Sequence, residues 1–257
     1  MVITSTKNEL VKAMRRLKER SARRDMGLHL IEGERLVFDA LESGVVPDTI
    51  FIEEGRTKLS QRLEGFGLPY IEVSSSVLQA VADTPSPQGI AASVRTPDTS
   101  LPLELGDGLF VALDALQDPG NLGTIIRTAD AMGAAGILLG RGCTDAFSPK
   151  ALRASMGSSY HLPIYEAELG CCIPLLKRQG FLPICGHLNG RIGVPDIGEN
   201  RRILIVIGNE GNGVSDEVAS LCELVRLPMY GRAESLNASV AASILIFCAA
   251  EAMHAKE

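Results

Sequence analysis

The chain has 257 residues, enough for one large or two modest domains, and a formal net charge of −6 at pH 7. Hydrophobic residues make up 46% of the chain, aromatic residues 4%, and Trp is absent, so any core must be built from Ala, Val, Ile and Leu. No apolar run reaches the roughly 18 residues that a membrane-spanning helix needs, and no signal-peptide pattern follows the first lysines. We therefore expect a cytoplasmic protein without a membrane partner.

The first predicted helix is basic, although the chain as a whole is acidic. Val11, Met14 and Leu17 form a helix-period apolar stripe, and eight basic residues stand against two acidic ones from Lys7 to Arg24. A basic helix is most often only a solvated face, but an excess this dense on an acidic protein is also typical of an RNA-binding surface. The candidate RNA-binding residues are Lys12, Arg15, Arg16, Arg23, Arg24 and Arg35.

Short strands and helices then alternate up to residue 95. The predicted strands cover residues 28–31, 49–52, 69–73 and 89–94, and the predicted helices cover 35–43 and 74–81. This pattern indicates a small α/β domain over residues 1–95. The prolines and glycines of residues 96–108 are typical of a linker.

From residue 109 onward the order β-α-β repeats. The predicted strands cover residues 109–113, 137–139, a short stretch around Ile164, 182–185 and 202–207, and the predicted helices cover 121–132, 149–155, 173–179 and 237–255. Strands this uniformly apolar are usually central strands of a parallel sheet that is covered on both faces. We therefore predict a second α/β domain over residues 109–257.

The last predicted helix is apolar almost all the way round. The apolar residues spread over most of its circumference are Val240, Ala241, Ile244, Leu245, Phe247, Cys248 and Ala249. A helix of this kind is buried against more than one surface. One face is expected in the core and the other in a subunit interface, which favours a homodimer.

Six cysteines are scattered without a CxxC pair or a nearby His at ligand spacing. This disfavours a zinc site, a disulfide framework and, with no electropositive neighbourhood evident, a catalytic cysteine. We expect buried, reduced thiols and no metal.

The segment 208–213 follows the most apolar strand and reads GNEGNG. It lacks the GxGxxG order of a dinucleotide fold, and no GxxxxGK[ST] motif is present. Glu210 would repel a phosphate, so a neutral or cationic ligand fits this loop better than an anion. The alternative is a plain glycine-rich turn.

Two further places combine polar side chains with apolar surroundings. Arg127 lies among apolar neighbours in the predicted helix 121–132, so it is expected either to form a salt bridge, perhaps with Glu210, or to point at a substrate. In the segment 234–239, Ser235 or Asn237 can cap the last helix, but capping does not account for all of its polar groups.

These places fall in three long segments, and their sequences are NLGTIIRTAD (121–130), GNEGNGVS (208–215) and LPMYGRAESLNASVAA (227–242). In order and spacing they resemble the signature motifs of the SpoU (TrmH) branch of the SPOUT RNA methyltransferases. The resemblance implies methyl transfer from S-adenosylmethionine to a ribose 2′-hydroxyl of RNA, without a metal. It also implies a parallel-sheet domain with a deep C-terminal trefoil knot, a rarity among folds, and a homodimer through that domain.

The resemblance implies roles for individual residues as well. The residues implied in catalysis are Asn121, Arg127, Glu210, Ser235 and Asn237, and those implied in cofactor binding are Gly208, Asn209, Gly213, Leu227, Met229 and Leu236. A guanidinium is protonated at ordinary pH, so we expect Arg127 to orient the hydroxyl and its phosphate rather than act as a base. The N-terminal region is similar to the ribosomal-protein-like substrate-binding domain of that family.

Large-subunit ribosomal RNA is the expected substrate, because tRNA-specific relatives tend to have short terminal extensions instead of an N-terminal domain. A tRNA 2′-O-methyltransferase and a non-catalytic RNA-binding or ribosome assembly factor are the alternatives. A dinucleotide oxidoreductase is disfavoured by the glycine spacing and by Glu210. The modified nucleotide, the proton acceptor and the biological purpose, ribosome maturation or antibiotic resistance, stay open at this point.

Overall fold

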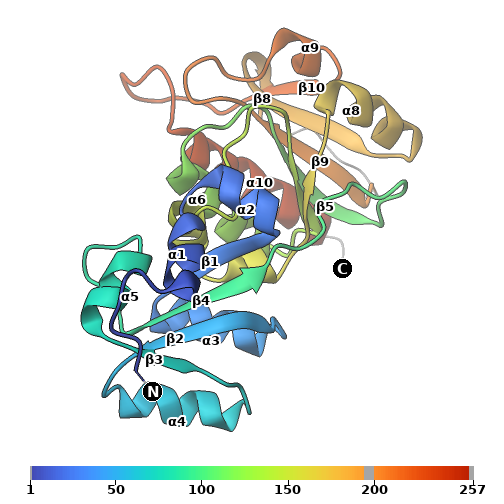
Figure 1. Cartoon of the computed structure of the whole chain (residues 1–257). Coiled ribbons are helices and arrows are strands. Elements are labelled where there is room, and N and C mark those ends of the chain that lie inside the picture. Colours follow the sequence, from blue (N-terminus) through green and yellow to red (C-terminus); the bar gives the residue numbers. More distant parts are fainter. Residues whose placement is uncertain (1, 194–199, 255–257) are drawn as a thin grey trace. The chain divides into compact units, whose positions relative to one another are not determined.

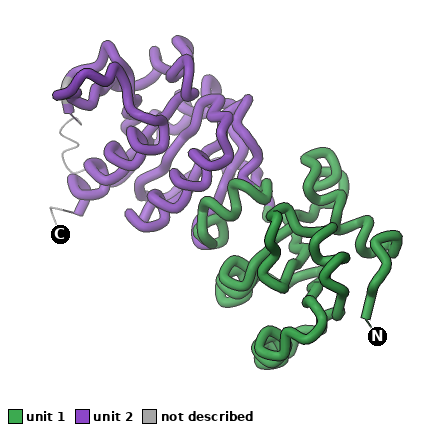
Figure 2. Tube along the Cα trace, turned by 90° about the vertical axis from the view of Figure 1, so that its left-hand side faces the viewer, with its two compact units in different colours: residues 1–97, 147–160 green, residues 98–146, 161–257 purple. Residues whose placement is uncertain are grey.

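The computed structural model describes residues 2–193 and 200–254 (Figure 1). Contacts divide the chain into two compact units: unit 1 is Met1–Pro97 with Phe147–Tyr160, and unit 2 is Asp98–Ala146 with His161–Glu257 (Figure 2). This division differs from the predicted domain ranges 1–95 and 109–257 in one respect. The segment 147–160 follows the linker in sequence, yet it packs with the N-terminal part of the chain.

Unit 1 is built on a mixed sheet of four strands. They are β1 (Leu28–Glu32), β2 (Pro47–Glu53), β3 (Ile71–Val73) and β4 (Ile90–Arg95). Their spatial order is β1-β4-β2-β3, with β4 antiparallel to both neighbours and β3 parallel to β2. The helices of the unit are α1 (Glu9–Arg16), α2 (Arg20–Met26), α3 (Glu34–Glu42), α4 (Thr57–Gly65), α5 (Ser75–Val81), α7 (Pro149–Ser155) and the short 3-10 helix η1 (Ser158–Tyr160).

The predicted apolar stripe of the first helix is confirmed. Val11, Met14 and Leu17 are buried in one cluster with Phe51 of β2 and Leu78 of α5. The basic segment is not one helix, however. It breaks after α1 and resumes as α2, so its charges lie on two short helices.

Unit 2 is built on a six-stranded sheet in which every strand pair is parallel, as predicted. The strands are β5 (Gly108–Leu113), β6 (Gly136–Leu139), β7 (Ile164–Glu166), β8 (Leu182–Ile192), β9 (Arg202–Ile207) and β10 (Glu223–Arg226), in the order β10-β8-β9-β5-β6-β7. Its helices are α6 (Pro119–Ala131), α8 (Leu169–Arg178), α9 (Asp216–Ala219) and α10 (Ala238–His254).

Helices cover the sheet of unit 2 on both faces. Ile173 of α8 and Val218 of α9 pack on one face, in a cluster with Phe110 of β5 and Leu204 of β9. Helix α10 packs against α6 and against strands β5, β8 and β9. This double cover explains why the strands are apolar on both sides.

Several elements differ from the predicted ones. The sequence pattern does not indicate α4 or β10, α8 begins at Leu169 instead of residue 173, and β8 continues beyond residue 185. The last helix is confirmed as far as His254; its predicted end, Ala255, lies outside the described residues. Over the residues that the structure describes, no helix is both long and apolar enough to cross a membrane.

Candidate active site at the carboxyl ends of strands β5 and β9

The polar segments of unit 2 gather where strands β5 and β9 end. These strands are parallel neighbours, and their last residues, Leu113 and Ile207, are paired in register. The chain leaves β5 toward β6 on one side, whereas β9 and β8 lie on the other side. Such a point, at the carboxyl ends of parallel strands where the winding reverses, is where open α/β sheets bind ligands.

Asn209 organises the loop 208–213. Its side-chain Nδ2 donates to the Ala115 carbonyl at 2.8 Å, and its Oδ1 accepts from the backbone N–H of Gly211 at 2.9 Å and of Asn212 at 3.1 Å. The backbone of Asn209 also exchanges two hydrogen bonds with Gly213. The predicted glycine-rich loop is therefore a closed turn that is tied to the end of β5.

Gly208 allows that turn to close. A Cβ at this position would overlap the backbone of Gly213 and Val214. Backbone atoms cannot move aside as a flexible side chain can, so any larger residue here would open the turn.

Glu210 is held by the start of α6. Its carboxylate accepts from the Asn121 side-chain amide at 3.0 Å and from the backbone N–H of Asp118 at 2.9 Å and of Gln117 at 3.2 Å. Burial opposes the ionised form, but the hydrogen bonds from Asn121 and the backbone outweigh it and lower the pKa of the Glu210 carboxyl. The acid therefore stays charged at neutral pH and excludes anions from the loop.

Asn237 joins the same group. Its Nδ2 donates to Asn121 Oδ1 at 3.1 Å, while its own Oδ1 accepts from the backbone N–H of Ser239 at 2.9 Å and from the Ser239 hydroxyl at 2.7 Å. Asn237 is thus the N-cap of α10, and it is one of the two residues that the sequence offered for this cap. Glu210, Asn121 and Asn237, one from each sequence segment, form a continuous hydrogen-bonded chain.

Arg127 does not join that chain. It lies exposed on α6, and within the described residues its guanidinium makes no hydrogen bond or ion pair. Of the two alternatives for Arg127, the salt bridge with Glu210 is not formed in the described residues; Asn121 and backbone N–H groups hold that carboxylate instead. Ser235 is exposed too, two residues before Asn237 in the loop between β10 and α10.

The loop between β10 and α10 also carries three of the expected cofactor-binding residues. Leu227 is partly buried, and Met229 and Leu236 are exposed although their side chains are apolar. The other three expected residues, Gly208, Asn209 and Gly213, belong to the turn after β9. The structure therefore supplies a backbone-rich turn and a set of apolar side chains for a ligand.

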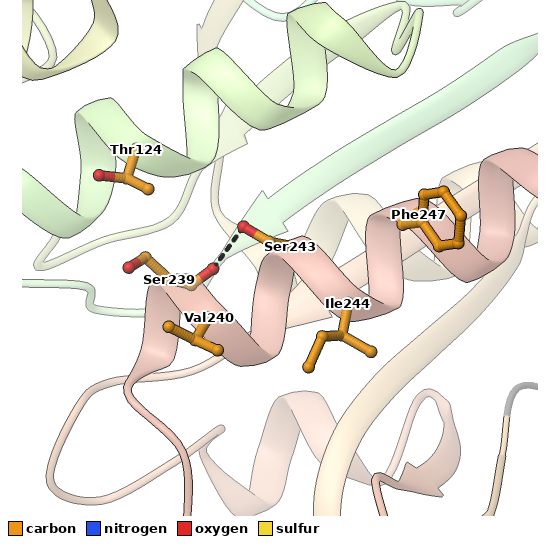
Figure 3. A pocket seen from close by; sticks show the side chains of 6 residues that line it. All are labelled: Thr124, Ser239, Val240, Ser243, Ile244 and Phe247. Atoms are coloured by element: carbon orange, nitrogen blue, oxygen red, sulfur yellow. Dashed lines mark hydrogen bonds between the residues drawn. The ribbon is translucent and has the colours of Figure 1, made fainter.

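An open groove of about 310 Å³ lies between α6 and α10 (Figure 3). Its lining residues are Thr124, Ser239, Val240, Ser243, Ile244 and Phe247. Thr128 and Ser243 bridge the two helices through their hydroxyls at 3.0 Å. The exposed Val240, Ile244 and Phe247 follow helix spacing, which is the sequence signal that had indicated a second apolar face.

Five of the six predicted RNA-binding residues lie at the surface of unit 1. These are Lys12, Arg15, Arg16, Arg24 and Arg35. Arg23 requires a correction: it is only 6% exposed, and its guanidinium donates to the carbonyls of Leu17 and Lys18, both at 2.8 Å. Arg23 therefore binds the carbonyl groups that follow α1, and it is not exposed for RNA binding as expected.

The cysteines are all free thiols, but they are not all buried. Burial raises the pKa of Cys143 to about 11 and that of Cys185 to about 12, whereas Cys171 is exposed, contrary to expectation. Over the described residues, no cluster of three or more His, Cys, Asp or Glu side chains could hold a metal ion.

Two family models match the chain. The SpoU rRNA Methylase family matches residues 108–247, which contain the whole of the Glu210, Asn121 and Asn237 group. The chain belongs to the SpoU rRNA methylase family. The MRM3-like substrate binding domain matches residues 8–92, so this SpoU family member also carries the N-terminal substrate-binding domain that its sequence resembles.

Relatives and solved structures agree with that family. The chain is 37% identical to a Bacillus subtilis protein named 23S rRNA (guanosine(2553)-2'-O)-methyltransferase RlmP, over 95% of the chain and 97% of the relative. An AdoMet-bound rRNA methyltransferase from Sinorhizobium meliloti superposes with a TM-score of 0.85 at 33% identity, covering 98% of this chain and 97% of that one. The SpoU methyltransferase AviRb from Streptomyces viridochromogenes, solved with AdoMet, superposes with a TM-score of 0.85 at 27% identity, covering 95% of this chain and 98% of that one.

Some groups of this SpoU site were not indicated by the sequence. Asp114 accepts from the backbone N–H of Ser215 at 2.8 Å, and the backbone of Gln117 and Asp118 holds Glu210. Ala115, between them, has a left-handed φ of 54°. Backbone donors and strained turns leave no side-chain pattern, so only the position of Asp114 directly after a strand could have indicated this part of the site.

Proposed function

We propose that this chain transfers a methyl group from S-adenosylmethionine to a ribose 2′-hydroxyl of large-subunit ribosomal RNA. The observation that carries the proposal is the hydrogen-bonded chain of Glu210, Asn121 and Asn237 at the carboxyl ends of β5 and β9. It unites the three segments within the residues that the SpoU family model matches. The Bacillus subtilis relative, named as a 23S rRNA 2′-O-methyltransferase, supports the choice of RNA.

The turn and loop suit S-adenosylmethionine better than a nucleotide phosphate. Asp114 and Glu210 place carboxylates at the ends of β5 and β9, where a phosphate would be repelled and a sulfonium would not. The backbone of Gly208, Leu227 and Leu236 would hold the adenosine. Asn209, Gly213 and Met229 would complete the site. When bound, the cofactor supplies a methyl group that its own positive sulfur activates.

The residues of the chain then have a positioning task. Glu210 fixes Asn121, and Asn121 fixes Asn237, so the N-terminus of α10 is held against α6. Ser235 and Asn237 would lie next to the ribose, on either side of Leu236. Arg127 is exposed and uncommitted within the described residues, so it is available to orient the hydroxyl and an adjacent phosphate. Its guanidinium stays protonated and does not act as the base.

Unit 1 would supply most of the RNA affinity. Lys12, Arg15, Arg16, Arg24 and Arg35 are exposed there, and neutralising phosphates is the main source of nonspecific RNA affinity. The match of residues 8–92 to a substrate-binding domain supports this role. It also favours ribosomal RNA over transfer RNA. A ribosomal substrate in turn supports a cytoplasmic location.

Two finer features complete the proposal. The exposed apolar residues of α10 in the groove beside α6 would be covered by a second copy of the chain, giving a homodimer. The C-terminal part of unit 2 would pass through a loop as a deep trefoil knot. Both features are supported by family membership.

Arg127→Ala tests the division of labour. Because the Arg127 guanidinium makes no hydrogen bond or ion pair to the turn or the loop of the cofactor site in the described structure, affinity for S-adenosylhomocysteine should stay within about twofold of the wild type. Methyl transfer should fall by about a hundredfold or more, as when one donor to a transition state is removed. Calorimetry and transfer of radiolabelled methyl to unmethylated 23S rRNA give the two readouts.

Arg178→Ala, which removes an exposed arginine at the end of α8, is the matched control and should behave as the wild type. Equal loss of cofactor affinity and transfer in Arg127→Ala would contradict the proposed role. A wild-type chain that binds cofactor and RNA without transfer would be an assembly factor. Mapping 2′-O-methyl positions in the RNA of cells with and without the gene would show whether the substrate is ribosomal or transfer RNA.

A further inference from the structure

We propose that Tyr230 stacks on an unpaired base of the substrate RNA, next to the ribose that is methylated. This inference rests on the proposed function and adds to it a residue that selects how the RNA enters the site. Tyr230 is not among the residues that the sequence analysis assigned to catalysis, cofactor or RNA.

The Tyr230 ring is unusually free for an aromatic side chain. It is 95% exposed, and in the described part of the chain it has no aromatic or hydrogen-bonding partner. Another of the four tyrosines, Tyr160, is instead tied by its hydroxyl to His29 at 2.8 Å. Leaving a large ring in water forgoes the burial that normally stabilises the fold, so this ring has its whole surface available for a partner outside the chain.

The position of the ring is that of a substrate contact. Tyr230 lies in the loop from β10 to α10, drawn in orange-red in Figure 1, which also carries Ser235 and ends at Asn237. Met229 and Leu236 in the same loop are far more covered, at 37% and 36% exposure. Among the large apolar side chains of this loop, Tyr230 is therefore the one that is almost entirely presented to solvent, at the edge of the proposed reaction site.

The charges around the ring favour RNA over a protein partner or the cofactor. In sequence, Arg226 and Arg232 stand on either side of Tyr230, with Glu234 as the one acid of the loop; both arginines are exposed, and among the described residues neither pairs with a carboxylate. An exposed aromatic ring with unpaired arginines close to it in the chain is the combination that binds single-stranded nucleic acid, through base stacking and phosphate contacts. A sulfonium cofactor, in contrast, gains nothing from nearby cations.

A single tryptophan can report the stacking directly. The chain has no Trp, so Tyr230→Trp introduces a unique fluorophore that keeps a stacking surface. Adding an unmethylated 23S rRNA fragment in the presence of S-adenosylhomocysteine should quench its emission strongly. Leu103→Trp is the matched control, because Leu103 is 97% exposed in the same unit but lies before β5, away from the site. Its emission should change little. Equal responses from both variants would overturn the proposal.

Kinetics supply the second arm. Tyr230→Ala should raise KM for the RNA fragment by about 5- to 150-fold, the range expected for loss of one stacked base, and Tyr230→Phe should restore it. Affinity for S-adenosylhomocysteine should not change. Loss of cofactor affinity in Tyr230→Ala would mean that the ring covers the cofactor, a drop in native mass would mean that it contacts a second subunit, and an unchanged KM would mean that it contacts no base. Each of these outcomes would overturn the inference.

The two hypotheses fail in different ways. If the wild-type chain transfers no methyl group to RNA, the proposed function fails, whereas the quenching of Tyr230→Trp still decides whether the ring meets a base. If the wild type transfers methyl, but Tyr230→Ala has the KM of the wild type for RNA and Tyr230→Trp responds no more than Leu103→Trp, only the inference about Tyr230 fails.

Discussion

Asn121 connects the three sequence segments because it uses both ends of one amide. Its Nδ2 donates to Glu210 and its Oδ1 accepts from Asn237, so its amide orientation is fixed by an acceptor-only carboxylate on one side. The sequence motifs led us to expect these three residues to lie together with Arg127 and Ser235, and hydrogen bonds join the three but, in the described residues, neither of the other two. A salt bridge between Glu210 and Arg127 stayed open as one of two alternatives in the sequence, because the backbone N–H groups that hold this acid carry no side-chain signature.

Asn237→Ala tests whether the cap of α10 is part of the site. Losing an N-cap should lower the free energy of unfolding by about 1 kcal/mol, and losing the bond to Asn121 should also impair methyl transfer. Ser74→Ala is the control: Ser74 caps α5 by accepting from Val77 N–H at 3.4 Å, and α5 carries none of the proposed RNA-binding residues. It should cost similar stability in urea unfolding and leave cofactor affinity intact.

If Ser74→Ala and Asn237→Ala reduce transfer equally, the effect of Asn237 is only structural. Comparing the two at matched folded fractions removes the contribution of stability from the comparison.

The number of buried residues in a helix or strand explains whether the sequence pattern could indicate it. Buried strands such as β5 and β9 are uniformly apolar and were predicted almost to the residue. In α4 only Leu59 and Leu63 are buried, and in β10 only Val225 is, since β10 forms the edge of its sheet. Elements with so few buried positions have too weak a periodicity to be distinguished from loops.

The exposed apolar face of α10 leads to a prediction about subunits. Phe247→Glu should convert the proposed dimer to a monomer, because a carboxylate would be buried without a partner in the interface. Leu175→Glu on α8 is matched: Leu175 and Phe247 are both 50% exposed. Sedimentation equilibrium should give half the wild-type mass for Phe247→Glu and the full mass for Leu175→Glu. If both variants have the same native mass, the exposed apolar face of α10 is not part of the subunit interface.

The division into units could not be predicted from chain order. Segment 147–160 lies between β6 and β7 of the second sheet, yet its side chains complete the first unit. Arg153 donates to Glu32 at 2.9 Å and to Asp83 at 2.8 Å, and Glu32 also accepts from the backbone N–H of Asp83 and Thr84. Such long-range partners appear in the sequence only as isolated polar residues.

Arg153→Ala should therefore destabilise the N-terminal unit. The Glu32 side chain is 5% exposed, so removing its guanidinium partner leaves a buried carboxylate. The backbone donors retain part of its stabilisation, so we expect a loss of about 2 kcal/mol, below the range for a fully broken buried pair. Arg56→Ala, which removes the exposed pair with Glu53, should cost less than about 1 kcal/mol. Urea unfolding followed by circular dichroism compares them, and equal losses would contradict a structural role for segment 147–160.

The split composition of unit 1 has a consequence for biosynthesis. A ribosome releases all four strands of the N-terminal sheet well before it makes Tyr160, whose hydroxyl meets the buried His29. N-terminal units generally fold first as the nascent chain emerges. Here the last segment of the first unit emerges only after residues 98–146 of the second, so the final contacts of the first unit form while the second is still being made.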